Sequence, residues 1–137
     1  MERLKERMAE SIRAWRMLNK ALLVRKPSIL ERDGAIQRFE FTFESVWKTS
    51  QLYLKEAESI TANSPKACIR TLGETGILSE TETIQALAMA NDRNLTAHTY
   101  IESVAKHIYG KLKKHAVLLR DMLIRMQEKA GLPLKRF

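Results

Sequence analysis

An arginine and a histidine in one short polar segment of this sequence could together cleave a phosphodiester bond. The segment, residues 93–100, reads RNLTAHTY and begins with Arg93. Histidine exchanges protons near neutral pH, and the planar guanidinium of arginine matches phosphate oxygens. Arg93 would hold the scissile phosphate, and His98 would act as base on a ribose 2′-hydroxyl or as acid on the leaving oxygen. This chemistry needs no metal ion and no cofactor, so we expect neither.

The same residue types also have a structural interpretation. Asn94 and His98 could cap and bridge helix ends, while Arg93 pairs with a neighbouring acid. Under the functional interpretation, residues 93–100 form a junction between two helices, where polar side chains project into solvent or a cleft. The following helix would begin beside His98, and its positive dipole end would favour a neutral imidazole and attract an anionic substrate.

Other catalytic patterns are absent from the sequence. It contains no Walker loop, no dinucleotide-binding glycine fingerprint, no GxSxG and no HExxH, and its acids are not spaced to hold magnesium. We therefore do not expect this chain to transfer nucleotides on its own. His107 and His115 lie eight residues apart and could share a helix face, but without a third ligand we predict no metal site. The single cysteine, Cys68, is expected to be a small core residue.

Apolar residues recur every three or four positions over most of the chain, which predicts amphipathic helices. Phe39, Phe41 and Phe43 alternate as in a strand, but helical spacing continues on both sides of them, so we predict a helix there too. The inward face of the fourth helix is expected to carry Ile84, Leu87 and Ala88. Five helices are predicted, at about residues 2–25, 28–59, 65–71, 79–92 and 99–130.

The helix boundaries follow from capping residues, proline and glycine. Three pairs have the spacing of a capping box, in which a Ser or Thr side chain and a Glu three residues later satisfy each other's backbone N–H groups. These pairs are Ser28 with Glu31, Ser79 with Glu82, and Thr99 with Glu102. Pro27 is expected to stop the first helix, Gly73 and Gly76 the third, and Gly131 with Pro133 the fifth.

Short connections between successive helices predict an all-α, up-and-down bundle of about five helices, with residues 1–137 forming one domain. No apolar run is long enough to cross a membrane, and the charged N-terminus does not resemble a signal peptide. We therefore expect a cytoplasmic protein without a membrane partner.

The net charge of +8 is concentrated at the two ends of the chain. Residues 1–27 carry +5, residues 28–105 carry −4, and residues 106–137 carry +7. Basic blocks attract polyanions such as RNA through counterion release, but they also form the solvated faces of ordinary helices. If the first and last helices lie side by side, their exposed faces form one positive surface. The sequence leaves these alternatives open.

Three segments resemble a known family. Arg93, His98 and Tyr100 resemble the R-x4-H-x-Y motif of HEPN domains, and DRNLTAHTY is similar to the subfamily of nucleotidyltransferase substrate-binding proteins. QRFEFTFESVWK, residues 37–48, resembles that subfamily's aromatic second helix, and SPKACIRTLGETGIL, residues 64–78, its short third helix. The resemblance spans about residues 30–120. The sequence departs from the family pattern at two places, both of them packing positions. Ser45 and Val46 replace the Leu-Ala pair expected before Trp47, and the fourth helix lacks the expected tryptophan.

The resemblance implies a homodimer of helical bundles that associates with a separately encoded minimal nucleotidyltransferase. In one interpretation the chain is a toxin-type, metal-independent ribonuclease with Arg93 and His98 as catalytic residues. In the other it is a non-catalytic subunit that presents a nucleotide or another substrate to its enzyme partner. The complete motif favours the first interpretation, and the acidic balance of residues 28–105 favours the second.

The resemblance also implies a role for Tyr100, which would be modified with AMP by the nucleotidyltransferase partner. Tyr100 falls at the edge of the apolar stripe of the fifth helix, so its hydroxyl is expected to face a cleft. Added phosphate would engage Arg93 and repel RNA. Alternatively, Tyr100 only anchors the start of that helix. Asn94 and Thr99 are expected to support the site.

Overall fold

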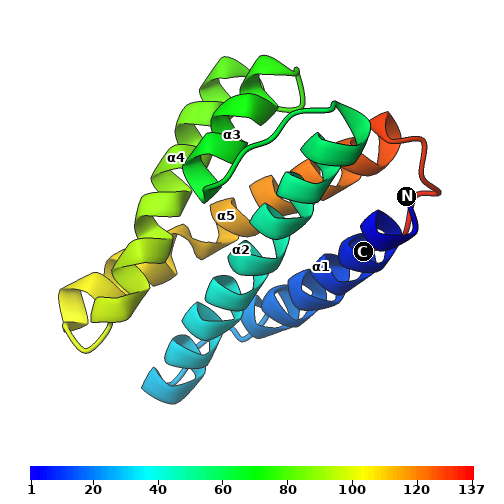
Figure 1. Cartoon of the computed structure of the whole chain (residues 1–137). Helices are drawn as coiled ribbons and strands as arrows, with labels where there is room; N and C mark the ends of the chain where they lie inside the picture. The colour runs from blue at the N-terminus through cyan, green and yellow to red at the C-terminus, as the bar shows by residue number, and fades with distance from the viewer.

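The computed structural model describes all 137 residues and contains helices but no strand (Figure 1), which confirms the all-α prediction. The helices are α1 (Glu2–Leu22), α2 (Ile29–Ala57), α3 (Pro65–Glu74), α4 (Glu80–Leu95) and α5 (Glu102–Lys129), with a 3₁₀ turn η1 (Thr96–His98) between α4 and α5.

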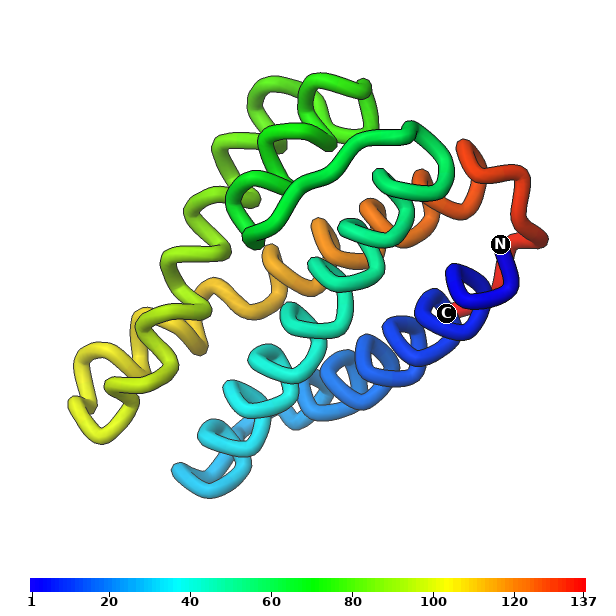
Figure 2. The backbone as a smooth tube through the Cα atoms, in the orientation of Figure 1, coloured from blue at the N-terminus to red at the C-terminus, as the bar shows by residue number.

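The helices form a bundle in which α1, α2 and α5 pack against one another, while α3 and α4 cover α2 and α5 from the other side. The chain reverses direction between α1 and α2 and again between α4 and α5, and Figure 2 shows the two chain ends close together. Trp15 of α1 donates a hydrogen bond from Nε1 to the carbonyl oxygen of Ala116 in α5, at 2.7 Å. The two basic ends of the chain therefore lie side by side.

The predicted apolar stripes of the three long helices are confirmed, except that Ile101, which was expected to begin the stripe of the fifth helix, is 43% exposed and precedes α5. Buried hydrophobic side chains form one continuous core, and Cys68 is part of it, as expected. Phe39 and Phe43 are buried on one face of α2, whereas Phe41 is 49% exposed, as helical rather than strand spacing requires. The main stripes are Leu4, Met8, Ile12, Trp15, Leu18 and Leu22 in α1; Ile36, Phe39, Phe43, Val46, Tyr53 and Leu54 in α2; and Ile108, Leu112, Ala116, Leu119, Leu123 and Met126 in α5.

The first two predicted capping boxes are present, and the third prediction is wrong. Ser28 with Glu31 opens α2, and Ser79 with Glu82 opens α4, each with both reciprocal hydrogen bonds. α5 instead begins after Ile101 without a side-chain cap. The side chain of Glu102 instead pairs with Arg32 at the start of α2, at 2.6 Å.

The prediction for the inward face of α4 is wrong for Ile84 and Ala88, which are exposed, whereas Leu87 packs partly against the core; the helix is also longer than predicted. Its buried residues are Ala86, Met89, Ala90 and Asp92, whereas Ile84 is 64% exposed. Small side chains let α4 approach its neighbours closely, and Gly73 of α3 lies inside that helix instead of ending it. A Cβ atom at Gly73 would come within 2.5 Å of the Thr83 hydroxyl oxygen on α4. The glycine thus permits the contact between α3 and α4, while Gly76, with φ +85°, makes the turn.

None of the helices combines the length and the apolarity that a membrane-crossing segment needs.

Candidate functional site

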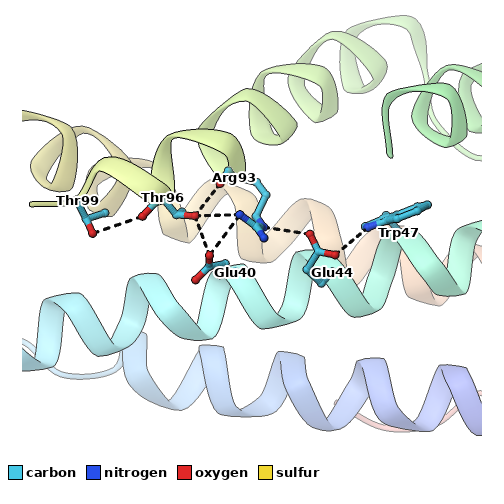
Figure 3. A network of polar contacts seen from close by, with 6 residues as sticks. All are labelled: Glu40, Glu44, Trp47, Arg93, Thr96 and Thr99. Atoms are coloured by element: carbon cyan, nitrogen blue, oxygen red, sulfur yellow. Dashed lines mark hydrogen bonds and ion pairs between the residues drawn. The ribbon is translucent and has the colours of Figure 1, made fainter. Parts of the chain in front are cut away.

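Arg93 lies in the last turn of α4, which extends three residues beyond its predicted end. There its guanidinium group faces α2 and is held by two carboxylates (Figure 3). Nε lies 3.1 Å from Glu44 Oε1, and a terminal nitrogen lies 3.3 Å from Glu40 Oε2. Because Glu40 and Glu44 are four residues apart on α2, both carboxylates project from the same helix face. The arginine is therefore more than neutralised by its own chain.

Further hydrogen bonds tie this ion-pair cluster to the end of α4. Arg93 donates to the Thr96 hydroxyl at 3.1 Å, and that hydroxyl lies 2.7 Å from the Arg93 carbonyl oxygen and 3.1 Å from Glu40 Oε2. On the other side, Trp47 donates from Nε1 to Glu44 at 3.2 Å. Figure 3 shows these side chains as one chain of contacts along α2. The arrangement anchors the C-terminal end of α4 to α2.

The other two motif residues take no part in this cluster. His98 ends η1 and is exposed, and Tyr100 is 80% exposed in the turn before α5. The Tyr100 hydroxyl lies 3.4 Å from His98 Nδ1, and the two rings meet edge to face with centroids 5.9 Å apart. α5 begins four residues after His98, so the expected helix N-terminus does not lie directly beside that imidazole.

The structure thus brings His98 and Tyr100 together but joins neither to Arg93 by a hydrogen bond or an ion pair. Asn94 is exposed on α4, and the Thr99 hydroxyl donates a long hydrogen bond of 3.5 Å to the Thr96 carbonyl oxygen. Within one chain, the geometry matches the structural interpretation of Arg93, which pairs with neighbouring acids. For His98 and Tyr100 it leaves two polar groups free at the surface.

The residue before Arg93 belongs to a second polar cluster, which the sequence analysis missed. Asp92 is 7% exposed, and its two carboxylate oxygens lie 2.7 Å from His115 Nε2 and 3.0 Å from His107 Nε2. The two histidines share one face of α5, as their spacing indicated. Asp92, near the end of the preceding helix, was a candidate partner for them, but the sequence does not show how closely the two helices pack.

His115 is the buried member of this cluster. Its ring stacks on Phe39 of α2, with centroids 5.2 Å apart. Burial lowers the pKa of His115 below its ordinary value, and the hydrogen bond to Asp92 opposes this only in part. A neutral imidazole can still donate from Nε2, so the hydrogen bond to Asp92 does not require a proton on both ring nitrogens.

A cavity of about 630 Å³ opens beside the two histidines, between α4 and α5. Lysines from α5 lie on its wall together with Glu82, whose pKa is lowered to about 2 by the hydrogen bond from Arg125 and by its capping contacts with Ser79. No group of three or more His, Cys, Asp or Glu side chains in the structure is arranged to hold a metal ion.

Comparison with known protein families identifies the family of this chain. A family model described as nucleotidyltransferase substrate binding protein like matches residues 6–128. The chain belongs to this family. The match confirms the resemblance seen in the three sequence segments, and it includes the whole of residues 93–100 as well as Asp92 and its two histidine partners.

A solved protein is similar to this chain in both fold and sequence. The crystal structure of a protein from Thermus thermophilus superposes with a TM-score of 0.83 at 43% sequence identity, covering 85% of this chain and 98% of that one. No curated protein is significantly similar to this nucleotidyltransferase substrate-binding-like chain.

Proposed function

We propose that this chain is the non-catalytic, substrate-binding partner of a separately encoded minimal nucleotidyltransferase. The observation that carries the proposal is the state of Arg93. The charge of this guanidinium is already offset by two carboxylates within 3.3 Å, so it is a weaker holder of a substrate phosphate than a free arginine. The same carboxylates would repel an approaching phosphodiester. Membership of the nucleotidyltransferase substrate-binding-like family supports the same conclusion.

In this proposal Tyr100 is the place where the enzyme partner acts on the chain. Its exposed ring can enter a partner's active site without unfolding any helix, and its hydroxyl already lies next to an imidazole. The phenolic oxygen would attack the α-phosphorus of ATP, forming a phosphodiester to AMP as pyrophosphate leaves. His98 would accept the phenolic proton through Nδ1. The partner supplies the metal-binding carboxylates of the reaction.

The test first looks for a short nucleotidyltransferase gene next to the gene of this chain, and then uses the full chain together with that enzyme. We expect the two proteins to copurify and, with ATP and magnesium, the intact mass of this chain to rise by one AMP. Tyr100→Phe should remove the mass gain, whereas Tyr109→Phe, a tyrosine on α5, should retain it. Failure of the two proteins to associate would refute the partnership; an equal mass gain in all variants would refute only the role of Tyr100.

A second candidate function is metal-independent RNA cleavage, and the observation in its favour is the exposed His98 within a complete R-x4-H-x-Y motif. In a homodimer, an imidazole from each protomer could face a shared cleft. If this function holds, His98→Ala lowers RNA cleavage by roughly a hundredfold or more, the usual loss when a general acid or base is removed. Cleavage should persist in a chelator. RNA left intact by the wild-type protein would rule it out.

A further inference from the structure

A second concave surface is lined by residues of α1, α2 and the loop after α2, and by none of residues 93–100. It has a volume of about 460 Å³ and lies between α1, the C-terminal half of α2 and the loop at residues 61–63. We call it the basic pocket. It is lined by Arg3, Arg7, Lys48, Gln51, Leu52, Lys55, Thr61, Ala62 and Asn63.

Four cationic side chains converge on this pocket, and no acidic side chain lines it. None of Arg3, Arg7, Lys48 and Lys55 takes part in an ion pair. Like charges held in one concavity repel one another, so their convergence has a cost that a bound anion would remove. The unpaired cations therefore point to an anionic ligand.

The fold holds these cations on one surface by ordinary helix geometry. Arg3 and Arg7 are four residues apart on α1, and Lys48 and Lys55 are seven apart on α2, so each pair shares one helix face. The register between the two helices is fixed nearby, where the Thr49 hydroxyl donates to the Arg7 carbonyl oxygen at 3.2 Å.

The loop at residues 61–63, which forms the third wall of the pocket, is also fixed in place. The Gln51 side chain donates to the Ala62 carbonyl oxygen at 2.7 Å and so holds the loop at residues 61–63 against α2. The loop contributes Thr61 and Asn63, whose side chains can donate hydrogen bonds to an anion. The pocket is therefore built from three elements with defined contacts between them.

We propose that the basic pocket binds a phosphate-rich anion through its phosphate groups. Four cations match several negative charges rather than one, as in the polyphosphate of a nucleotide or successive phosphates of an RNA strand. The lining contains no aromatic side chain on which a base could stack, and Leu52 and Ala62 are its hydrophobic members. Binding should thus depend on phosphate number and charge, not on base identity. This site is separate from the function proposed for residues 93–100.

The experiment measures binding of inorganic tripolyphosphate, ATP and a short single-stranded RNA by titration calorimetry at several salt concentrations. The pocket variant is Arg7→Glu with Lys55→Glu. Its matched control is Arg13→Glu with Arg38→Glu, which makes the same charge change on the same two helices outside the pocket. Circular dichroism confirms that each variant is folded.

We expect the pocket variant to bind tripolyphosphate at least about tenfold more weakly than the control does, since two of the four cations that face the ligand are replaced by acids. If RNA is the ligand, the slope of log K against log salt falls by about 1.4 in magnitude, roughly 0.7 for each phosphate that the variant no longer neutralises. Binding of tripolyphosphate and ATP without RNA assigns the pocket to free polyphosphates. No binding by the wild-type protein, or equal losses in the two double variants, would overturn the proposal.

Discussion

The Arg93 cluster and the basic pocket use the same helix in opposite ways. Glu44 and Lys48 are one turn apart on α2, yet Glu44 neutralises an arginine from α4 while Lys48 joins three other cations that have no acidic partner. Arg93, which belongs to a recognisable motif, is thus less available to bind an anion than the cations of the basic pocket. Whether a cation can bind a ligand depends on the side chains of the neighbouring helix, and a sequence motif does not show these.

Mutations in the two regions should also differ in their effect on the stability of the fold. The Arg93 cluster and the neighbouring Asp92 cluster link α4 to α2 and α5 through partly or fully buried polar groups, and removing one of these groups leaves its partners unsatisfied. The basic pocket consists of surface cations whose removal leaves nothing unsatisfied. Mutations in the two regions therefore separate structural from ligand-binding roles.

The largest effect is expected at Asp92. Asp92→Ala removes the acceptor shared by His107 and His115 and should lower the free energy of unfolding by about 3 kcal/mol, the usual scale for breaking a buried charged network. Asp121→Ala is the control, because Asp121 lies on the same cavity wall and forms a weaker ion pair with Arg120, at 3.6 Å. Urea denaturation measures the free energy of unfolding of both variants. An equal decrease in the two would show that the Asp92 cluster contributes no more to stability than an ordinary surface ion pair.

The next effect compares the two kinds of arginine directly. Arg93→Ala leaves Glu40 and Glu44 facing each other without a cation and should cost about 1–2 kcal/mol of unfolding free energy. Arg7→Ala in the basic pocket should change it by less than about 0.5 kcal/mol, as for other surface positions. Thermal denaturation of the two variants checks this. If Arg7→Ala proved as destabilising as Arg93→Ala, the contrast between the regions would fail.

A smaller effect is expected on the pH dependence of stability. The pKa of His115 is lowered by burial in the folded protein, so the unfolded chain binds the proton more readily. The contribution of His115 is then fully present above its ordinary pKa of about 6.5 and is lost as the pH falls below that value toward the folded-state pKa. Urea denaturation from pH 7.5 to 5 should show a decline that is reduced in His115→Gln and unchanged in His98→Gln.

The smallest effect concerns repulsion within the basic pocket. Replacing both Lys48 and Lys55 by Ala should raise the unfolding free energy by a few tenths of a kcal/mol at low ionic strength, because like charges are removed. The gain should disappear in about 1 M salt, where the screening length is about 3 Å. A gain that persisted in high salt would have another cause, such as the higher helix propensity of alanine.

Sequence patterns predicted the long helices well because their signals are local. The stripes of α1, α2 and α5 repeat at helical spacing over most of each helix, and two capping boxes marked the starts of α2 and α4. The face of α4 was predicted wrongly because its contacts depend on small residues. Ala86 and Ala90 are buried by close approach to neighbouring helices, which hydrophobic spacing does not reveal, whereas the larger Ile84 is exposed.

The candidate site was harder to predict because its contacts are distant in sequence. The partners of Arg93, Glu40 and Glu44, lie about fifty residues earlier in the chain, and only the packing of α4 on α2 brings them together. The basic pocket was hidden for the same reason. Its cations have regular spacing within each helix, but they form one surface only through the register between α1 and α2. The exposure of His98 and Tyr100, by contrast, followed from their position between two helices.

The indole of Trp47 gives the Arg93 cluster a built-in optical reporter. The chain has two tryptophans, and Trp15 is buried against α5, whereas Trp47 is partly exposed and donates its hydrogen bond to Glu44. Indole fluorescence responds to nearby charge and to water. In a Trp15→Phe background, emission from Trp47 should therefore differ between the chain that keeps Arg93 and an Arg93→Ala variant. Recording that emission during unfolding would show when the Arg93 cluster separates, without any added dye.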